Sequence, residues 1–258
     1  MQLLKCMLIG LFVMGLGACG VSKGNIPVRA PTELVSHMGA STVGLVLKNM
    51  EGKARVYCTG VWVSQDTVLT ANHCVEAAAR IQRAMAAKAA GHEQTEAEED
   101  VPVDPVGLAV NYVVESEVTG VGEEPSAVHL AKVIACDDLH DLALVRALPA
   151  SLPKHDVTEL VEEMPGLGEH VYIVGHVKGL WWSYIEGVIS AYRKDLPNID
   201  KGGPFVQVSG PVYYGNSGGG LFDARGDLVG ICSFMSRAPQ TNFFIHADSI
   251  KKFLKNNL

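Results

Sequence analysis

The feature that most limits the fold is the recurrence of short apolar stretches, bounded by Gly, Asn, Asp or Pro, along most of the 258 residues. Such stretches are typical of β-strands at the spacing found in sandwiches and barrels. A chain of this length can bury a sizeable core, and its charged content of only 19% argues against disorder. The net charge of −7, without a concentrated basic run, gives no reason to expect a nucleic-acid partner.

A serine lies within the glycine-rich segment Gly215–Gly220. Glycines let the backbone turn sharply, so that consecutive N–H groups can point at one spot and stabilise an oxyanion. Ser217 is therefore a candidate nucleophile, although Gly-Asn-Ser-Gly also occurs in ordinary turns. His73, in Leu-Thr-Ala-Asn-His-Cys, and Asp141, in Asp-Leu-Ala-Leu-Val, precede it. Alone, each is more typical of a core histidine or a turn carboxylate, but the order His, Asp, Ser is that of chymotrypsin.

With these segments, the chain resembles trypsin-like serine proteases of the chymotrypsin fold, nearest to their bacterial heat-shock branch. The resemblance covers roughly residues 36–255 apart from an insert. Besides the three motifs it rests on Ser41–Val46, Thr59–Ser64, Val68–His73, Leu167–Gly175, Glu186–Ala191, Phe205–Val208 and Asp227–Ser233. It implies an all-β fold of two six-stranded antiparallel Greek-key β-barrels, followed by a helix.

The resemblance also divides the chain into regions. A protease domain is expected over residues 36–258, with a first barrel at about 36–150, a second at about 160–248 and a closing helix at 249–256. The expected strands are Val43–Leu47, Arg55–Val63, Thr67–Leu69, Val106–Val114, Ala131–Ala135, Leu142–Arg146, Val171–Val174, Ser183–Tyr192, Phe205–Ser209, Gly220–Phe222, Leu228–Phe234 and Asn242–Ile245. The heat-shock proteases usually carry a peptide-binding PDZ domain next, and we expect none after Leu258.

The resemblance assigns a role to each member of the expected triad. Ser217 would attack the scissile carbonyl, and it needs a base because a serine hydroxyl is a poor nucleophile. His73 would take and return the proton, and Asp141 would fix the tautomer of its imidazole. Asp137 and Asp138 compete for the acid role, but the Leu-Ala-Leu-Val after Asp141 matches the family.

Further residues are expected to support the triad. The backbone N–H groups of Gly215 and Ser217 would form the oxyanion hole, and the hydroxyl of Ser233 would support Asp141. Digestive proteases have an aspartate before the serine that captures a newly cut N-terminus. Asn216 stands there and has no charge to pair with an ammonium. We therefore expect no activation cleavage, and a chain that starts at Val35 should be active.

The resemblance also suggests where substrate specificity is set. By alignment, Pro211, Met235 and Asn242 approach the primary pocket. Pro211 takes the place of trypsin's aspartate, so a basic side chain before the scissile bond would meet no carboxylate. Small or medium apolar residues are the better expectation.

An insert follows His73 at residues 75–105. Its alanine-rich part, Val75–Ala90, should be helical, and Ile81 and Met85, four residues apart, could face the barrel. The insert is either a solvated helix and loop, or a lid or partner surface near the active site. No His-Glu-x-x-His or Cys-x-x-Cys motif indicates a metal site, and we expect no metal and no cofactor.

The N-terminus has the plan of a signal peptide at residues 1–18. Leu16–Cys19 resembles the bacterial lipobox, which implies cleavage before Cys19 and acylation of that cysteine. Several acyl chains anchor a protein firmly. The alternative is a secretory signal cut near Ala18. We expect residues 19–35 to be a tether, and the protein to be exported and held at the cell envelope, on the periplasmic face of the outer membrane where the source has two membranes.

The cysteines agree with export. Cys58 and Cys74 match the family's disulfide across the histidine loop, which needs an oxidising compartment, although two buried free thiols are the alternative. Cys136 and Cys232 are left over and could pair or pack as free thiols.

Together these features favour a lipid-anchored serine endopeptidase that acts on peptide or protein substrates. A non-catalytic binding protein or chaperone with the same fold is the alternative, and acyl transfer to non-peptide esters would use the same machinery. The sequence leaves the oligomeric state open.

Overall fold

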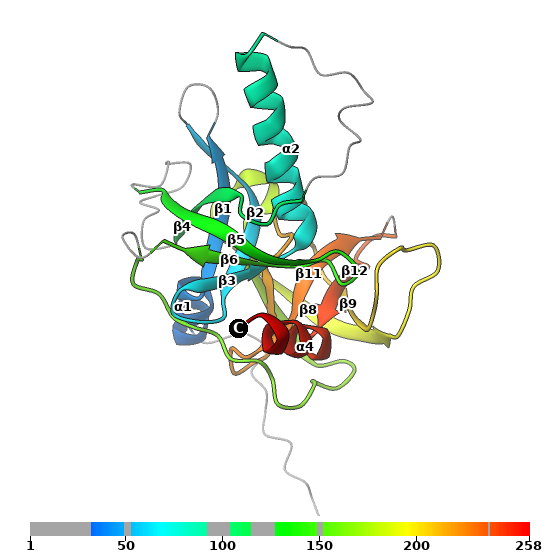
Figure 1. Cartoon of the computed structure of the whole chain (residues 1–258). Coiled ribbons are helices and arrows are strands. Elements are labelled where there is room, and N and C mark those ends of the chain that lie inside the picture. Colours follow the sequence, from blue (N-terminus) through cyan, green and yellow to red (C-terminus); the bar gives the residue numbers. More distant parts are fainter. Residues whose placement is uncertain (1–31, 49–52, 92–103, 115–126, 149–151, 237) are drawn as a thin grey trace, which may run out of the picture.

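The computed structural model describes residues 32–48, 53–91, 104–114, 127–148, 152–236 and 238–258. Two closed barrels of antiparallel strands form the body of the protein (Figure 1). The first barrel contains β1 (Thr42–Lys48), β2 (Ala54–Trp62), β3 (Thr67–Thr70), β4 (Ala109–Val114), β5 (His129–Asp137) and β6 (Leu142–Ala147). The second contains β7 (His170–Gly175), β8 (Ser183–Arg193), β9 (Phe205–Ser209), β10 (Gly220–Phe222), β11 (Leu228–Met235) and β12 (Asn242–His246).

The two barrels have the same strand order. The first closes in the order β1-β2-β3-β6-β5-β4, and the second in the order β7-β8-β9-β12-β11-β10. This arrangement confirms the expected pair of six-stranded barrels. The strand boundaries differ from the expected ones by a few residues at most, because the strand signals are local.

Each barrel is filled by apolar side chains, and a further set joins them. Trp62 and Tyr112 are fully buried in the first barrel, with their rings edge to face at 5.6 Å. A second cluster combines Leu69 of the first barrel with Tyr172 and Phe222 of the second. The core is therefore continuous across the boundary, which fixes the ends of the strands that carry the candidate site.

Among the described residues, three α-helices accompany the barrels. In α1 (Thr32–Ala40), Met38 is buried, and the hydroxyls of Ser41 and Thr42 donate to its carbonyl oxygen. The expected tether, residues 19–35, ends inside this helix. The last helix, α4 (Ala247–Asn257), begins two residues before the expected closing helix and buries Ile250 and Phe253.

The insert begins with α2 (Asn72–Ala89), which projects from the body (Figure 1). Only its first turns are packed, with Val75, Ala78 and Ala79 buried. Ile81 and Met85, at 39% and 41% exposure, do not pack on the barrel, so the expectation that they face it was wrong. The reason is geometric, because the helix axis points away from the barrel surface. Residues 92–103 of the insert lie outside the described residues.

Among the described segments, no helix combines the length and apolarity needed to cross a membrane.

Candidate active site

The pairing of β3 with β6 brings together two of the candidate catalytic residues. His73 follows β3 in the first turn of α2, and Asp141 immediately precedes β6. The Asp141 carboxylate accepts from Nδ1 of His73 at 2.9 Å and from the His73 backbone N–H at 2.9 Å. Since the carboxylate only accepts, Nδ1 carries the ring proton, which leaves Nε2 free to accept one.

Asp141 is held as a carboxylate. Its side chain is 2% exposed, and burial by itself would raise its pKa. Hydrogen bonds from His73 and from the Ser233 hydroxyl outweigh burial, so the pKa of the Asp141 carboxyl lies below its usual value. Ser233 on β11 therefore contacts Asp141 from the second barrel, as expected.

The neighbouring acidic residues have other partners. Asp137 accepts from Nδ1 of His140 at 2.8 Å, and Asp138 pairs with Nζ of Lys201 at 2.6 Å. Of the three aspartates in this turn, Asp141 alone is hydrogen-bonded to His73 among the described residues.

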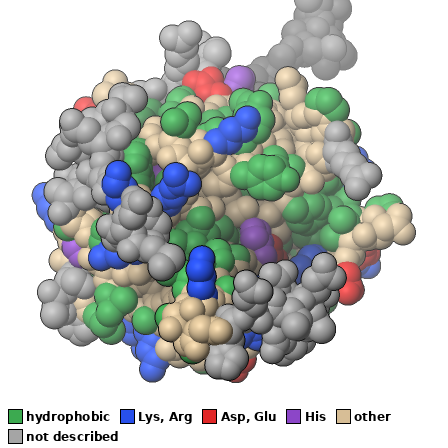
Figure 2. Space-filling view, turned by 90° about the horizontal axis from the view of Figure 1, so that it is seen from above, with side chains coloured by type: hydrophobic (Ala, Val, Ile, Leu, Met, Phe, Trp, Pro, Cys, Tyr) green, Lys and Arg blue, Asp and Glu red, His purple; other side chains and the backbone are tan. Residues whose placement is uncertain are grey.

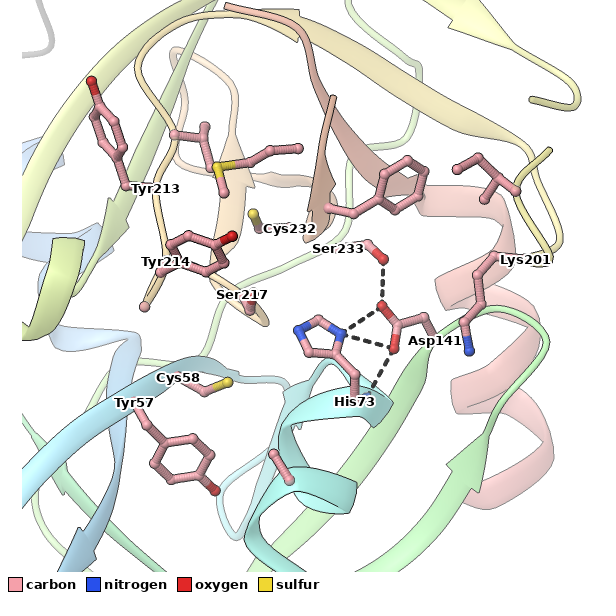
Figure 3. A pocket seen from close by; sticks show the side chains of 16 residues that line it. Tyr57, Cys58, His73, Asp141, Lys201, Tyr213, Tyr214, Ser217, Cys232 and Ser233 are labelled. Carbon is pink, nitrogen blue, oxygen red and sulfur yellow. Dashed lines mark hydrogen bonds and ion pairs between the residues drawn. The ribbon is translucent and has the colours of Figure 1, made fainter. Parts of the chain in front are cut away.

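Ser217 lies in the turn before β10, and it lines one cavity of about 660 Å³ together with His73 and Asp141. The turn is attached to the first barrel because the Thr59 N–H donates to the Ser217 carbonyl at 2.8 Å. In Figure 3 the second ring nitrogen of His73 faces the side where Ser217 lies. The Ser217 hydroxyl makes no hydrogen bond to another described residue, and such bonds often tighten only when substrate is present.

The two expected oxyanion donors are available. The N–H groups of Gly215 and Ser217 have no acceptor within the described part of the chain. Gly215 has a φ of +99°, in the region that favours glycine. Both N–H groups belong to the turn that carries the candidate nucleophile.

The histidine loop contains the expected disulfide between Cys58 and Cys74, with Cα atoms 6.1 Å apart. The sulfurs lie close to His73, but as a disulfide they offer no thiolate to a metal ion. Cys136 and Cys232 are free, and burial raises the pKa of both thiols to about 12, so both stay protonated at neutral pH.

The residues expected at the specificity pocket are divided between two hollows. Met235 lines the cavity of Ser217, as do Val212 and Cys232. Pro211 and Asn242 line an adjoining hollow of about 400 Å³ that shares Met235. Seen from the side of α2, hydrophobic side chains gather around an exposed histidine, with Lys and Arg beside them (Figure 2).

The sequence did not indicate several residues at this site. Tyr57, Ile199 and Lys201 also line the cavity (Figure 3). Tyr57 precedes Cys58, so its position next to an expected disulfide was the one available signal. Ile199 and Lys201 lie between β8 and β9, and they reach the site through tertiary packing that no local pattern reports.

Comparison with known proteins agrees with this geometry. The sequence profile described as "Trypsin-like peptidase domain" matches residues 58–231. A probable periplasmic serine endoprotease DegP-like of Pseudomonas putida is 36% identical over 103 residues, which are 40% of this chain and 21% of the relative. The corresponding protein of Marinomonas sp. is 32% identical over 127 residues, which are 49% of this chain and 26% of the relative. The matched part thus spans about a fifth to a quarter of these relatives.

Solved structures share the fold at lower sequence identity. The HtrA-type protease AlgW with a tripeptide has a TM-score of 0.60 and 20% identity, over 86% of this chain and 62% of that one. The serine endoprotease from Yersinia pestis has a TM-score of 0.59 and 19% identity, over 88% of this chain and 67% of that one. Since the profile match extends over more than half of the residues and its limits include the histidine, aspartate and serine described above, the chain belongs to the trypsin-like peptidase domain family.

Proposed function

We propose that this protein is a serine endopeptidase that cleaves peptide bonds through an acyl-enzyme, with Ser217, His73 and Asp141 as its catalytic residues. The main support is the buried Asp141 carboxylate bonded to the His73 ring, beside the cavity that Ser217 lines. A carboxylate at Nδ1 holds the imidazole in the tautomer that can accept a proton at Nε2.

The proposed reaction has two halves. The Ser217 oxygen attacks the carbonyl carbon while Nε2 of His73 takes its proton, and the carbonyl oxygen becomes an oxyanion beside the N–H groups of Gly215 and Ser217. The protonated His73 then gives its proton to the leaving amine as the carbon–nitrogen bond breaks. In the second half, His73 takes a proton from water, the resulting hydroxide attacks the acyl carbon, and the proton returns to Ser217 as the acid product leaves.

A serine-reactive fluorophosphonate tests the assignment directly. Wild-type protein should be labelled and should cleave an unfolded protein substrate, whereas folded Ser217→Ala should do neither. His73→Ala should also abolish labelling, because the hydroxyl loses its base. Folded wild-type protein that is neither labelled nor active would support the alternative, a non-catalytic binding protein or chaperone that keeps the fold.

We also propose that the protein is exported and anchored in the cell envelope by lipid on Cys19, after removal of residues 1–18 as a signal peptide. These residues lie outside the described part of the structure. The names of the relatives, which are called periplasmic, support export, and the disulfide requires an oxidising compartment.

Fractionation of cells tests the anchor. Wild-type protein should require detergent for release, and Cys19→Ala should appear in the soluble fraction. Cys6→Ala is the matched control, because Cys6 lies inside the apolar run of the proposed signal peptide and should leave the anchor intact. Wild-type protein that is soluble without detergent would instead favour a secretory signal cut near Ala18.

A further inference from the structure

A turn in the second barrel contacts the backbone at Tyr214 and Gly215. The turn contains His176 and the 3-10 helix η3 (Val177–Gly179) that follows β7. The Lys178 N–H donates to the Tyr214 carbonyl at 2.7 Å. The carbonyl oxygen of His176 would lie 2.0 Å from a Cβ placed on Gly215, so the two backbones are in direct contact. The peptide before Gly215 is thereby fixed.

The peptide after Gly215 is held by a side chain of the first barrel. The Thr59 hydroxyl donates to the Gly215 carbonyl at 2.7 Å. The same hydroxyl oxygen lies 3.0 Å from Nδ1 of His176. A hydroxyl has one proton to donate, and a carbonyl can only accept. Thr59 therefore gives its proton to Gly215 and accepts from Nδ1–H of His176, which leaves Nε2 of His176 without a proton.

The surroundings of His176 keep its ring neutral. His176 is fully buried, and Trp182 and Trp181 lie against it at ring distances of 4.4 Å and 5.8 Å. Burial lowers the pKa of His176 to about 3. Nε2 has no hydrogen-bond partner within the described residues. The ring thus donates through Nδ1 at every working pH.

These contacts determine where the Gly215 N–H points. In a trans peptide, the C=O and N–H groups point in opposite directions. The Tyr214 carbonyl points at Lys178 in η3, so the N–H of Gly215 points away from η3 and is available to a substrate oxygen. Gly215 itself has a φ of +99°, a conformation that glycine alone adopts readily.

The side chain of the neighbouring Asn216 does not hold the loop. It is fully buried, but neither its Nδ2 nor its Oδ1 has a hydrogen-bond partner within the described residues. An uncharged amide also cannot form the buried ion pair that an aspartate could form at this position. The hold on the loop comes from Thr59 and the His176 turn instead.

We propose that Thr59 and His176 are positioning residues for the Gly215 N–H: a neutral relay, His176 Nδ1–H to Thr59 Oγ1–H to the Gly215 carbonyl, fixes the peptide after Gly215, while the turn at His176 fixes the peptide that carries the N–H in its oxyanion-binding orientation. This inference rests on the proposed function, since Gly215 matters only if an oxyanion forms. Neither Thr59 nor His176 lines the cavity of Ser217.

A matched pair of variants tests the hydroxyl. Thr59→Val keeps the shape of the side chain and removes the proton, whereas Thr59→Ser keeps the hydroxyl and removes the methyl group. We expect kcat for a peptide substrate to fall about 10- to 100-fold in Thr59→Val with little change in KM, and Thr59→Ser to stay close to wild type. The upper part of that range is set by the roughly 10²- to 10³-fold cost of deleting a donor outright. Equal kcat in both variants, or an effect on KM alone, would overturn the proposal.

A second measurement needs no variant and no activity. Nitrogen-15 NMR of the histidine rings should show His176 protonated at Nδ1 alone and unchanged between pH 7 and pH 5. Protonation at Nε2, or titration of this ring within that range, would overturn the relay even if Thr59→Val fails to fold. If wild-type protein hydrolyses nothing while His176 shows the expected tautomer, the proposed function has failed and not the relay. If wild-type protein cleaves its substrate while His176 is protonated at Nε2 or titrates between pH 7 and pH 5, the relay has failed and not the proposed function.

Discussion

At the scale of single residues, Gly215 is a position that cannot carry a side chain. A Cβ there would lie 2.0 Å from the His176 carbonyl oxygen and 3.4 Å from the Lys178 nitrogen, and φ is +99°. Both the space and the conformation exclude a side chain. The close contact with His176 and η3 therefore requires glycine at the position expected to supply an oxyanion donor.

We predict that Gly215→Ala displaces the peptide before residue 215 and lowers kcat by about 10²- to 10³-fold, the cost of one lost oxyanion donor. Gly91→Ala is a suitable control, because Gly91 also has positive φ but nothing lies within 4 Å of its added Cβ. Steady-state kinetics of the two variants would check this. Comparable activity of Gly215→Ala and Gly91→Ala would contradict it.

His176 should also make stability depend on pH. Burial lowers the pKa of His176 to about 3 in the folded protein, below its ordinary value of 6.5. Between these two pH values, His176 is protonated in the unfolded chain but not in the folded protein. The contribution of His176 to the free energy of unfolding is therefore fully present above pH 6.5, and it is lost progressively as the pH falls toward 3. The slope from this residue is at most ~1.4 kcal/mol per pH unit.

We therefore expect His176→Gln, which cannot take up a proton, to lose less stability than wild type between pH 6.5 and pH 4. Urea unfolding at several pH values measures this difference. Burial lowers the pKa of His246 too, so both proteins will retain some dependence in this range. Parallel curves for the two proteins would show that His176 is not neutral when folded and charged when unfolded.

At the scale of elements, local motifs were predictable and tertiary contacts were not. The strands follow from short apolar runs, which are local, whereas the disulfide and the residues of the proposed triad were expected because the motifs around them resemble those of a known family. Helix α1 was missed because it lies next to residues that look like a linker. Thr59 and His176 were missed because they are 117 residues apart, and only the packing of the barrels brings them together.

The disulfide Cys58–Cys74 joins β2 to the first turn of α2, with a sequence separation of 16. In the chain-entropy model a loop of this size contributes ~3 kcal/mol. We predict that replacing both cysteines by alanine lowers the free energy of unfolding by about that amount and also reduces kcat, because His73 is adjacent to Cys74. Cys136→Ala, which removes a free and half-buried thiol, should change little. Urea unfolding, with and without reductant, would show the loss, and unchanged stability after reduction would contradict it.

At the scale of the whole molecule, the candidate site depends on contacts between the barrels. Asp141 and His73 belong to the first barrel, whereas Ser217 and Ser233 belong to the second. The Thr59 N–H to Ser217 carbonyl bond and the shared cluster of Leu69, Tyr172 and Phe222 hold the two halves in register. None of these contacts involves a free N-terminal ammonium.

We predict that a chain beginning at Thr32, the first residue of α1, is active without any cleavage. Asn216 has no charge for a new N-terminus to pair with, and the loop of Gly215 is already held by Thr59 and η3. A chain beginning at Val35 should also be active but unfold at lower temperature, because it loses Leu34, which packs against the core. Active-site titration with a fluorophosphonate, combined with intact mass measurement, would follow both chains. Labelling that appears only after the N-terminus has been trimmed would mean that the oxyanion loop needs an ammonium partner after all.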